Sequence, residues 1–280
     1  MLRGEIMDSE TAPPIISNAV GAETKTVARW RWWLHLILLG SLPLLVGVLG
    51  IIHRNRTIAA LPDTVPGLLR ISIYETVFPV LFFAVVWLVS RPTASQMLLP
   101  WRGGLMPILL GFAYSFALRV IIMILVIALV IIWVAIAGLH APGMENLRSQ
   151  SEHLVNAAAL TRDPLYFVLC LTLISFVVAG LREELWRAGM LAGCQALFPA
   201  HWGGKMAGVI VVGVLFGLGH TTQGLGGVGV TTLLGMGLGA IMLWHRSIWE
   251  AVIAHGCFDA TTFAMMYLIM KYHPELIQHL

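Results

Sequence analysis

Long apolar runs recur along this chain, and they constrain its fold more than any other feature. The clearest is residues 103–139, where Arg119 is the only charged residue. In hydrocarbon every backbone N–H and C=O group must be satisfied within the segment itself, so a run of about 20 apolar residues is expected to be a membrane-spanning helix. The sequence therefore predicts an all-α fold, a polytopic transmembrane helix bundle.

The composition agrees with a lipid environment. Hydrophobic residues make up 58% of the 280 residues and charged residues only 11%, whereas about 25% charged residues is usual in soluble proteins. The net charge of +3 comes without a basic run or patch, which argues against nucleic acid as a partner. Cys170, Cys194 and Cys257 have the spacing of neither a zinc framework nor a disulfide scaffold, and are interpreted as packing residues.

About seven spans are predicted, at approximately residues 34–52, 71–90, 120–139, 164–198, 206–221, 224–244 and 248–270. Residues 103–139 are too long for one upright span, so the part before residue 120 is interpreted as an interfacial helix or as half of a tilted one. The predicted organisation is a disordered tail, N-terminal spans, a polar loop and a catalytic core, at residues 1–30, 31–140, 141–163 and 164–272.

The orientation of the chain in the membrane stays open. Lys25, Arg29 and Arg31 before the first span favour a cytoplasmic N-terminus, because cytoplasmic loops are enriched in cations. Arg54 and Arg56 after the same span favour the opposite orientation.

A cluster of charges interrupts the apolar run that begins near residue 164. Arg182, Glu183, Glu184 and Arg187 lie within six residues. On a helix, Glu183 and Arg187 lie about 40° apart and Glu184 points about 100° away, so one carboxylate can be paired while the other stays free. A helix that leaves the membrane here would also explain the charges, but ionisable residues at membrane depth are by default candidates for function.

The predicted spans at residues 206–221 and 248–270 add acid–base groups. His220 follows a small-residue stretch, where a lone histidine is more often a packing residue than a catalyst. His255 and Asp259 are four residues apart on one helical face, where each can orient the other. Polar groups on three apolar helices of the C-terminal half are expected to converge. A carboxylate base, imidazoles and a hydrogen-bond donor to the oxyanion are the groups that amide hydrolysis requires.

The set resembles the signature of the CPBP family of intramembrane proteases, also called the Abi or CAAX-protease family. That signature is a Glu-Glu pair with a following Arg, then Phe-x-x-x-His, then His-x-x-x-Asn or Asp, and the matching residues here are Glu183, Glu184, Arg187, Phe216, His220, His255 and Asp259. The resemblance implies that Glu183 is the general base, that His220 helps to hold the attacking water, and that His255 with Asp259 stabilises the tetrahedral intermediate.

The resemblance also implies that Glu184 and Arg187 are structural support, with two departures from the family pattern. Arg187 follows Glu183 by four residues where five is usual, which leaves open which glutamate it restrains. Asp259 stands where the family often has Asn, and a carboxylate donates no hydrogen bond to an oxyanion unless it is protonated.

The predicted function is an intramembrane endopeptidase, most readily of a bacterial plasma membrane, with membrane lipids and a membrane-associated protein or peptide substrate as partners. The alternatives are a non-catalytic immunity or maturation partner, or a proton-coupled transporter. The cofactor is open as well. Two histidines and a carboxylate suit zinc, but water activation by Glu and His needs no metal, and His-Glu-x-x-His is absent.

Two further patterns fall outside the predicted site. The small-residue pairs Gly213/Gly217 and Gly235/Gly239 predict close packing of the helices around His220. Glu75 and Arg119 either pair with each other across the N-terminal spans or lie at the membrane interface and reach water, and the second interpretation is favoured.

Overall fold

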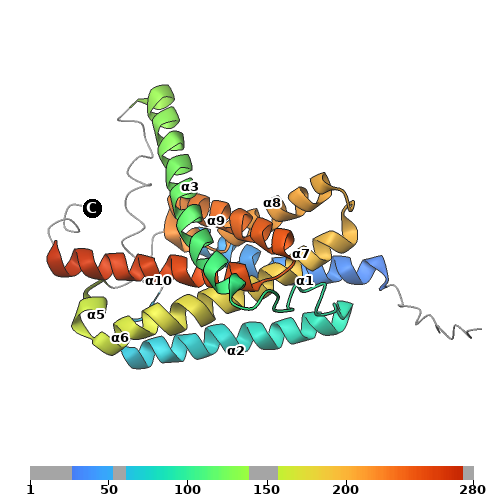
Figure 1. The fold of residues 1–280 in the computed structure, drawn as a ribbon, viewed down its shortest axis with the longest axis horizontal. Coiled ribbons are helices and arrows are strands. Elements are labelled where there is room, and N and C mark those ends of the chain that lie inside the picture. Colours follow the sequence, from blue (N-terminus) through green and yellow to red (C-terminus); the bar gives the residue numbers. More distant parts are fainter. Residues whose placement is uncertain (1–26, 53–60, 139–156, 274–280) are drawn as a thin grey trace, which may run out of the picture.

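The computed structural model describes residues 27–52, 61–138 and 157–273, and within these residues it contains helices and no strand (Figure 1). The helices are α1 (Arg29–Ile52), α2 (Val65–Ser90), α3 (Met106–Ala137), α5 (Ala157–Arg162), α6 (Pro164–Leu169), the π-helix η1 (Cys170–Leu181), α7 (Arg182–Leu197), α8 (Trp202–Leu218), the short 3₁₀ turn η2 (Thr221–Gln223), α9 (Gly224–His245) and α10 (Trp249–Tyr272).

The predicted polytopic helical bundle is confirmed. In the described part of the chain, six helices are long and apolar enough to cross a membrane, and α8, with 17 residues, is a shorter apolar helix. Of the predicted organisation, most of the N-terminal tail and residues 139–156 of the polar loop lie outside the described residues, while the end of that loop, Ala157–Arg162, forms α5.

Helix α3 is one continuous helix of 32 residues. At about 1.5 Å per residue it is about 48 Å long, well beyond the hydrocarbon thickness of about 30 Å. The interfacial-helix interpretation of residues 103–119 is therefore wrong, and the tilted one fits. In Figure 1, α3 leaves the bundle at a steep angle to α2 and α10.

One composite helix carries the charge cluster. It begins at Pro164, where the side chain of Asp163 caps it by accepting hydrogen bonds from the first backbone N–H groups. Between α6 and α7 it widens into η1, and the Ser175 hydroxyl donates to the carbonyl of Cys170, five residues earlier. Such π-type turns are frequent next to functional sites because they change which side chains face the interior.

Helices from both halves of the chain share one hydrophobic core. Trp32, Leu39 and Leu118 from the N-terminal half are buried in it together with Leu191 and Ala254. Helix α1 packs against α7 and α8, α2 against η1, and α3 against α10. The N-terminal spans are thus in direct contact with the helices that carry the predicted site.

Buried polar contacts fix α7 against α1 and α2. The fully buried His35 joins the carbonyl of Gly189 through Nε2 at 2.9 Å and the hydroxyl of Ser90 through Nδ1 at 2.8 Å. The indole of Trp186 donates to the carbonyl of Leu39 at 3.0 Å. These contacts join α7, which begins with Glu183 and Glu184, to two N-terminal helices.

Glycines allow the helices around the site to approach closely. A Cβ on Gly180 would lie 3.0 Å from the carbonyl oxygen of Val252, and one on Gly256 would lie 2.3 Å from the ring of Phe176. Helices η1 and α10 therefore meet almost backbone to backbone, directly beside His255.

The predicted packing of the small-residue pairs is confirmed at the α8–α9 contact. A Cβ on Gly213 would lie 3.0 Å from the backbone nitrogen of Met236, and one on Gly235 would lie 3.3 Å from the Cα of Gly213. The chain turns between these two helices just after His220, where Gly224 has a φ of 76° that favours glycine.

Candidate active site

The two adjacent glutamates at the start of α7 point to different partners. Glu184 forms an ion pair with Arg187, and both side chains are fully buried. Glu183 accepts a hydrogen bond from Arg182 Nη2 on Oε1 at 2.5 Å. The question that the sequence left open is thereby answered: Arg187 restrains Glu184, three residues before it, and leaves Glu183 free of that pairing.

His255 connects this pair to α10. Its Nδ1 donates to Glu184 Oε1 at 2.7 Å, while its Nε2 lies 3.9 Å from Glu183 Oε2 and 3.8 Å from Asp259 Oδ2. The sequence suggested that His255 and Asp259 orient each other. The hydrogen bond that orients the ring is instead made across the helix interface, because Glu184 is closer than the carboxylate one turn further along α10.

His220 reaches the cluster from the end of α8. Its Nδ1 donates to the carbonyl of Phe216 at 2.8 Å, which leaves Nε2 available. His220 makes no ion pair with a carboxylate among the described residues, and it approaches the cluster through the ring of Phe216, which packs against both its own ring and that of His255. All the predicted site residues therefore lie in one region, with His220 outside direct contact.

The ring of Phe216 forms an apolar wall between these groups. It lies 4.6 Å from the His220 ring and 6.1 Å from the His255 ring, measured between centroids. The guanidinium of Arg187 stacks on it at 4.3 Å, a cation–π contact that is strongest where water is excluded.

Burial falls from the inside of the cluster outward. The Glu184 and Arg187 side chains are 0% exposed, that of His255 4%, that of Glu183 15% and that of Asp259 29%. Glu184 Oε2 and Arg187 Nε and Nη2 have no hydrogen-bond partner among the described residues. Glu184 and Arg187 form a buried ion pair beneath the cluster, whereas Glu183 and Asp259 are accessible enough to contact a substrate.

Two charged residues of the N-terminal half approach the site, which the sequence did not predict. Glu75 on α2 forms an ion pair with Arg182. Arg119 Nη2 donates to the carbonyl of Phe258 at 2.5 Å and to the hydroxyl of Thr261 at 2.8 Å, beside Asp259. Glu75 and Arg119 thus bond to different partners, so the alternative in which they pair with each other is not found among the described residues, and the half-buried Arg119 side chain is held against α10. Arg119 is the lone charge of the most apolar run, and this position in the sequence could have marked it as a residue with a partner inside the protein.

The residues present do not form a metal-ligand set. Within the described ranges, no group of three or more His, Cys, Asp or Glu side chains is arranged to hold a metal ion.

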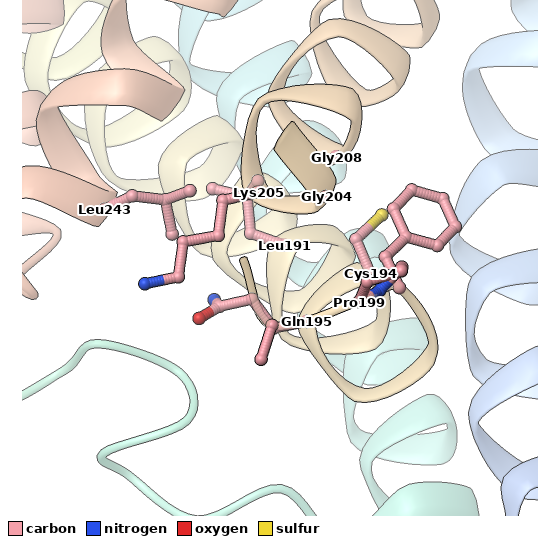
Figure 2. A pocket seen from close by; sticks show the side chains of 10 residues that line it. Leu191, Cys194, Gln195, Pro199, Gly204, Lys205, Gly208 and Leu243 are labelled. Atoms are coloured by element: carbon pink, nitrogen blue, oxygen red, sulfur yellow. The ribbon is translucent and has the colours of Figure 1, made fainter. Parts of the chain in front are cut away.

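A pocket lies elsewhere on the molecule, between α7, the turn after it and α8 (Figure 2). It is lined by residues such as Leu191, Cys194, Lys205 and Leu243, and by none of the predicted site residues. At about 1.5 Å per residue, Cys194 is about 17 Å along the helix from Glu183. The pocket therefore plays no part in the chemistry of the cluster.

Comparison with known families agrees with the cluster. Residues 164–261 match the family model described as type II CAAX prenyl endopeptidase Rce1-like. That segment contains every predicted site residue, whereas Glu75 and Arg119 lie outside it. The chain matches no curated protein and no solved structure.

Proposed function

We propose that this chain is a CAAX-type intramembrane endopeptidase, as the match of residues 164–261 to that family model indicates, and that its Glu183 activates water for the hydrolysis of a peptide bond. The chain is a multi-pass integral membrane protein, and the reaction class of its family is peptide-bond hydrolysis. This reaction class disfavours the non-catalytic partner and the transporter that the sequence alone allowed.

The arrangement that carries the proposal is the meeting of three polar atoms from two helices. His255 Nε2 faces Glu183 Oε2 at 3.9 Å and Asp259 Oδ2 at 3.8 Å. These separations are too long for direct hydrogen bonds, but one water bonded at about 2.8 Å to the imidazole and to a carboxylate fits between such atoms. A water in that position lies between a base and a polarising group.

In the proposed reaction Glu183 takes a proton from this water, and the water oxygen attacks the carbonyl carbon of the scissile bond. The carbonyl oxygen becomes an oxyanion that accepts a hydrogen bond from Nε2–H of His255 in its imidazolium form, which keeps Nδ1–H for Glu184. His220 uses Nδ1–H for the Phe216 carbonyl, so its Nε2 is an acceptor that can hold the attacking water. The proton on Glu183 then passes to the leaving amide nitrogen as the C–N bond breaks, which yields a carboxylic acid and an amine.

The remaining residues position these groups. Glu184 accepts from His255 Nδ1 and so holds the ring with Nε2 facing Glu183. Arg187 compensates the buried charge of Glu184. Asp259 lies beside the imidazole at a distance that suits electrostatic support of an imidazolium rather than a fixed hydrogen bond.

The substrate that we propose is a membrane-associated protein or peptide, because the cluster is carried by helices long and apolar enough to lie in the bilayer. The proposed location is a bacterial plasma membrane. A prenylated C-terminus is the substrate class that the name of the matching family suggests, and it is the first to test.

The test uses the full chain in lipid vesicles and a fluorogenic peptide that ends in a prenylated Cys-aliphatic-aliphatic-X segment, alongside the same peptide without the prenyl group. Glu183→Gln should lower kcat by about 10²–10⁴-fold, because the amide accepts no proton. Asp63→Asn removes an exposed carboxylate at a distance from the site and should leave kcat unchanged. Cleavage by the Glu183→Gln variant at the rate of the unmodified chain would exclude Glu183 as the base.

A further inference from the structure

Arg182 lies between two carboxylates that come from different halves of the chain. Its Nη1 pairs with the side chain of Glu75 on α2 and also lies 3.3 Å from the Glu75 carbonyl oxygen. Its Nη2 donates to Glu183 Oε1 at 2.5 Å. The side chains of Arg182 and Glu183 are 20% and 15% exposed, and that of Glu75 is 47% exposed. The chain of contacts thus runs inward from a half-exposed glutamate to the proposed base.

We infer that Arg182 is a positioning residue for Glu183 and that Glu75 anchors it, so that the N-terminal half of the chain completes the active site. The inference rests on the proposed function, because it assigns Arg182 a role through the base. It concerns residues that the resemblance left without a role, and Glu75 lies outside the segment that matches the family.

The geometry gives the reason. A guanidinium is planar and presents its N–H donors in a fixed fork, so holding one end determines where the other end points. With Nη1 held by Glu75, Nη2 fixes Oε1 of Glu183. The rotation of the carboxylate is then set, and Oε2 faces His255 Nε2 at 3.9 Å. Without this restraint the glutamate side chain can turn about its own bonds, and a misplacement of about 1 Å can cost about 100-fold in rate.

Charge compensation alone would be a different role, and lysine separates the two. Lysine keeps the positive charge but lacks the planar fork, so it can neutralise Glu183 without fixing its rotation from Glu75. A positioning role therefore predicts that Arg182→Lys recovers only part of the activity that Arg182→Gln loses.

The experiment measures kcat and KM of the full chain in lipid vesicles with the prenylated fluorogenic peptide. Arg182→Gln should lower kcat by about 10- to 100-fold with little change in KM. The kcat of Arg182→Lys should lie between that of Arg182→Gln and that of the unmodified chain. Glu75→Gln should lower kcat less than Arg182→Gln does. The double variant should match Arg182→Gln, because Glu75 acts through Arg182.

A matched control is Arg31→Gln. Arg31 on α1 also joins α2, by bonds to the carbonyls of Val89 and Leu88, but it does not touch the site. It should leave kcat unchanged, and thermal unfolding in detergent identifies any variant that fails to fold.

The inference is overturned if kcat of Arg182→Gln equals that of the control or exceeds that of the unmodified chain. It is also overturned if Arg182→Lys has the full kcat of the unmodified chain, or if the losses of kcat in the two single variants add up in the double variant. If Glu183→Gln is inactive while Arg182→Gln behaves like the control, only this inference fails. If Glu183→Gln is fully active, the proposed function itself fails.

Discussion

Replacing Gly217 by Ala is expected to push α8 away from α9 and to lower both stability and activity. A Cβ at this position would lie 1.9 Å from Thr232 Oγ1 and 2.8 Å from the carbonyl oxygen of Val228. Rotation of the threonine can relieve the first contact, but the second is with backbone, so the helices must separate. Gly217 lies between Phe216 and His220, both of which belong to the site region, and the displacement reaches them directly.

The magnitude follows from comparison with a second glycine. Gly229 on α9 is exposed and has no atom within 4 Å of where its Cβ would lie. Both Gly→Ala changes gain the helix preference of alanine over glycine, about 1 kcal/mol. The difference between the two variants therefore isolates the overpacking cost, about 1–3 kcal/mol at Gly217.

Unfolding of both variants in one detergent, followed by heat or denaturant, gives this difference, and cleavage of the fluorogenic peptide gives the effect on kcat. Gly229→Ala should be as stable as the unmodified chain or more so, and equally active. Equal stability of the two variants would refute the argument, since the close α8–α9 approach would then carry no energetic weight.

Two further substitutions test the inner contacts of the site. Asp259→Asn should keep most of the activity, because Glu184 rather than Asp259 makes the hydrogen bond that orients His255. A loss of kcat as large as that of a Glu184→Gln variant would show that Asp259 is needed as a carboxylate. Arg187→Met should destabilise the chain by about 3–5 kcal/mol, because it leaves the charge of Glu184 buried without its partner, and adding Glu184→Gln should recover stability without activity. Thermal unfolding checks the stability of each variant, and unchanged stability of Arg187→Met alone would contradict the assigned pairing.

Where most of the apolar helices lie was predictable because lipid leaves a chain few choices, although one of the seven predicted spans, α8, is a shorter apolar helix of 17 residues. A segment in hydrocarbon must satisfy its backbone within a helix, so apolar run length alone indicates where helices lie. Local signals set some ends as well, such as the capping Asp163 before Pro164. Run length did not distinguish the two interpretations of residues 103–119, since a tilted helix and a broken one have the same composition.

The gathering of these polar residues was also predictable, because ionisable side chains at membrane depth are costly and are expected to face one another or a wet cavity. Glu183, Glu184, His220, His255 and Asp259 stand out in the sequence for that reason, and the structure brings them into one region. Spacing along one helix, however, shows only which side chains share a face.

What only the tertiary structure decided is which face meets which helix. Glu184 and Glu183, three and four residues before Arg187, are both within reach of its side chain. Arg187 pairs with Glu184 because this glutamate is the one turned inward against α10. The contact of Arg182 with Glu75 likewise joins residues 107 positions apart, and no periodicity in the sequence records such a meeting. The sequence by itself determined that this chain spans a membrane and which polar residues gather there. The pairing of those residues depended on helix packing, because a one-dimensional pattern carries no information about the rotation of one helix relative to another.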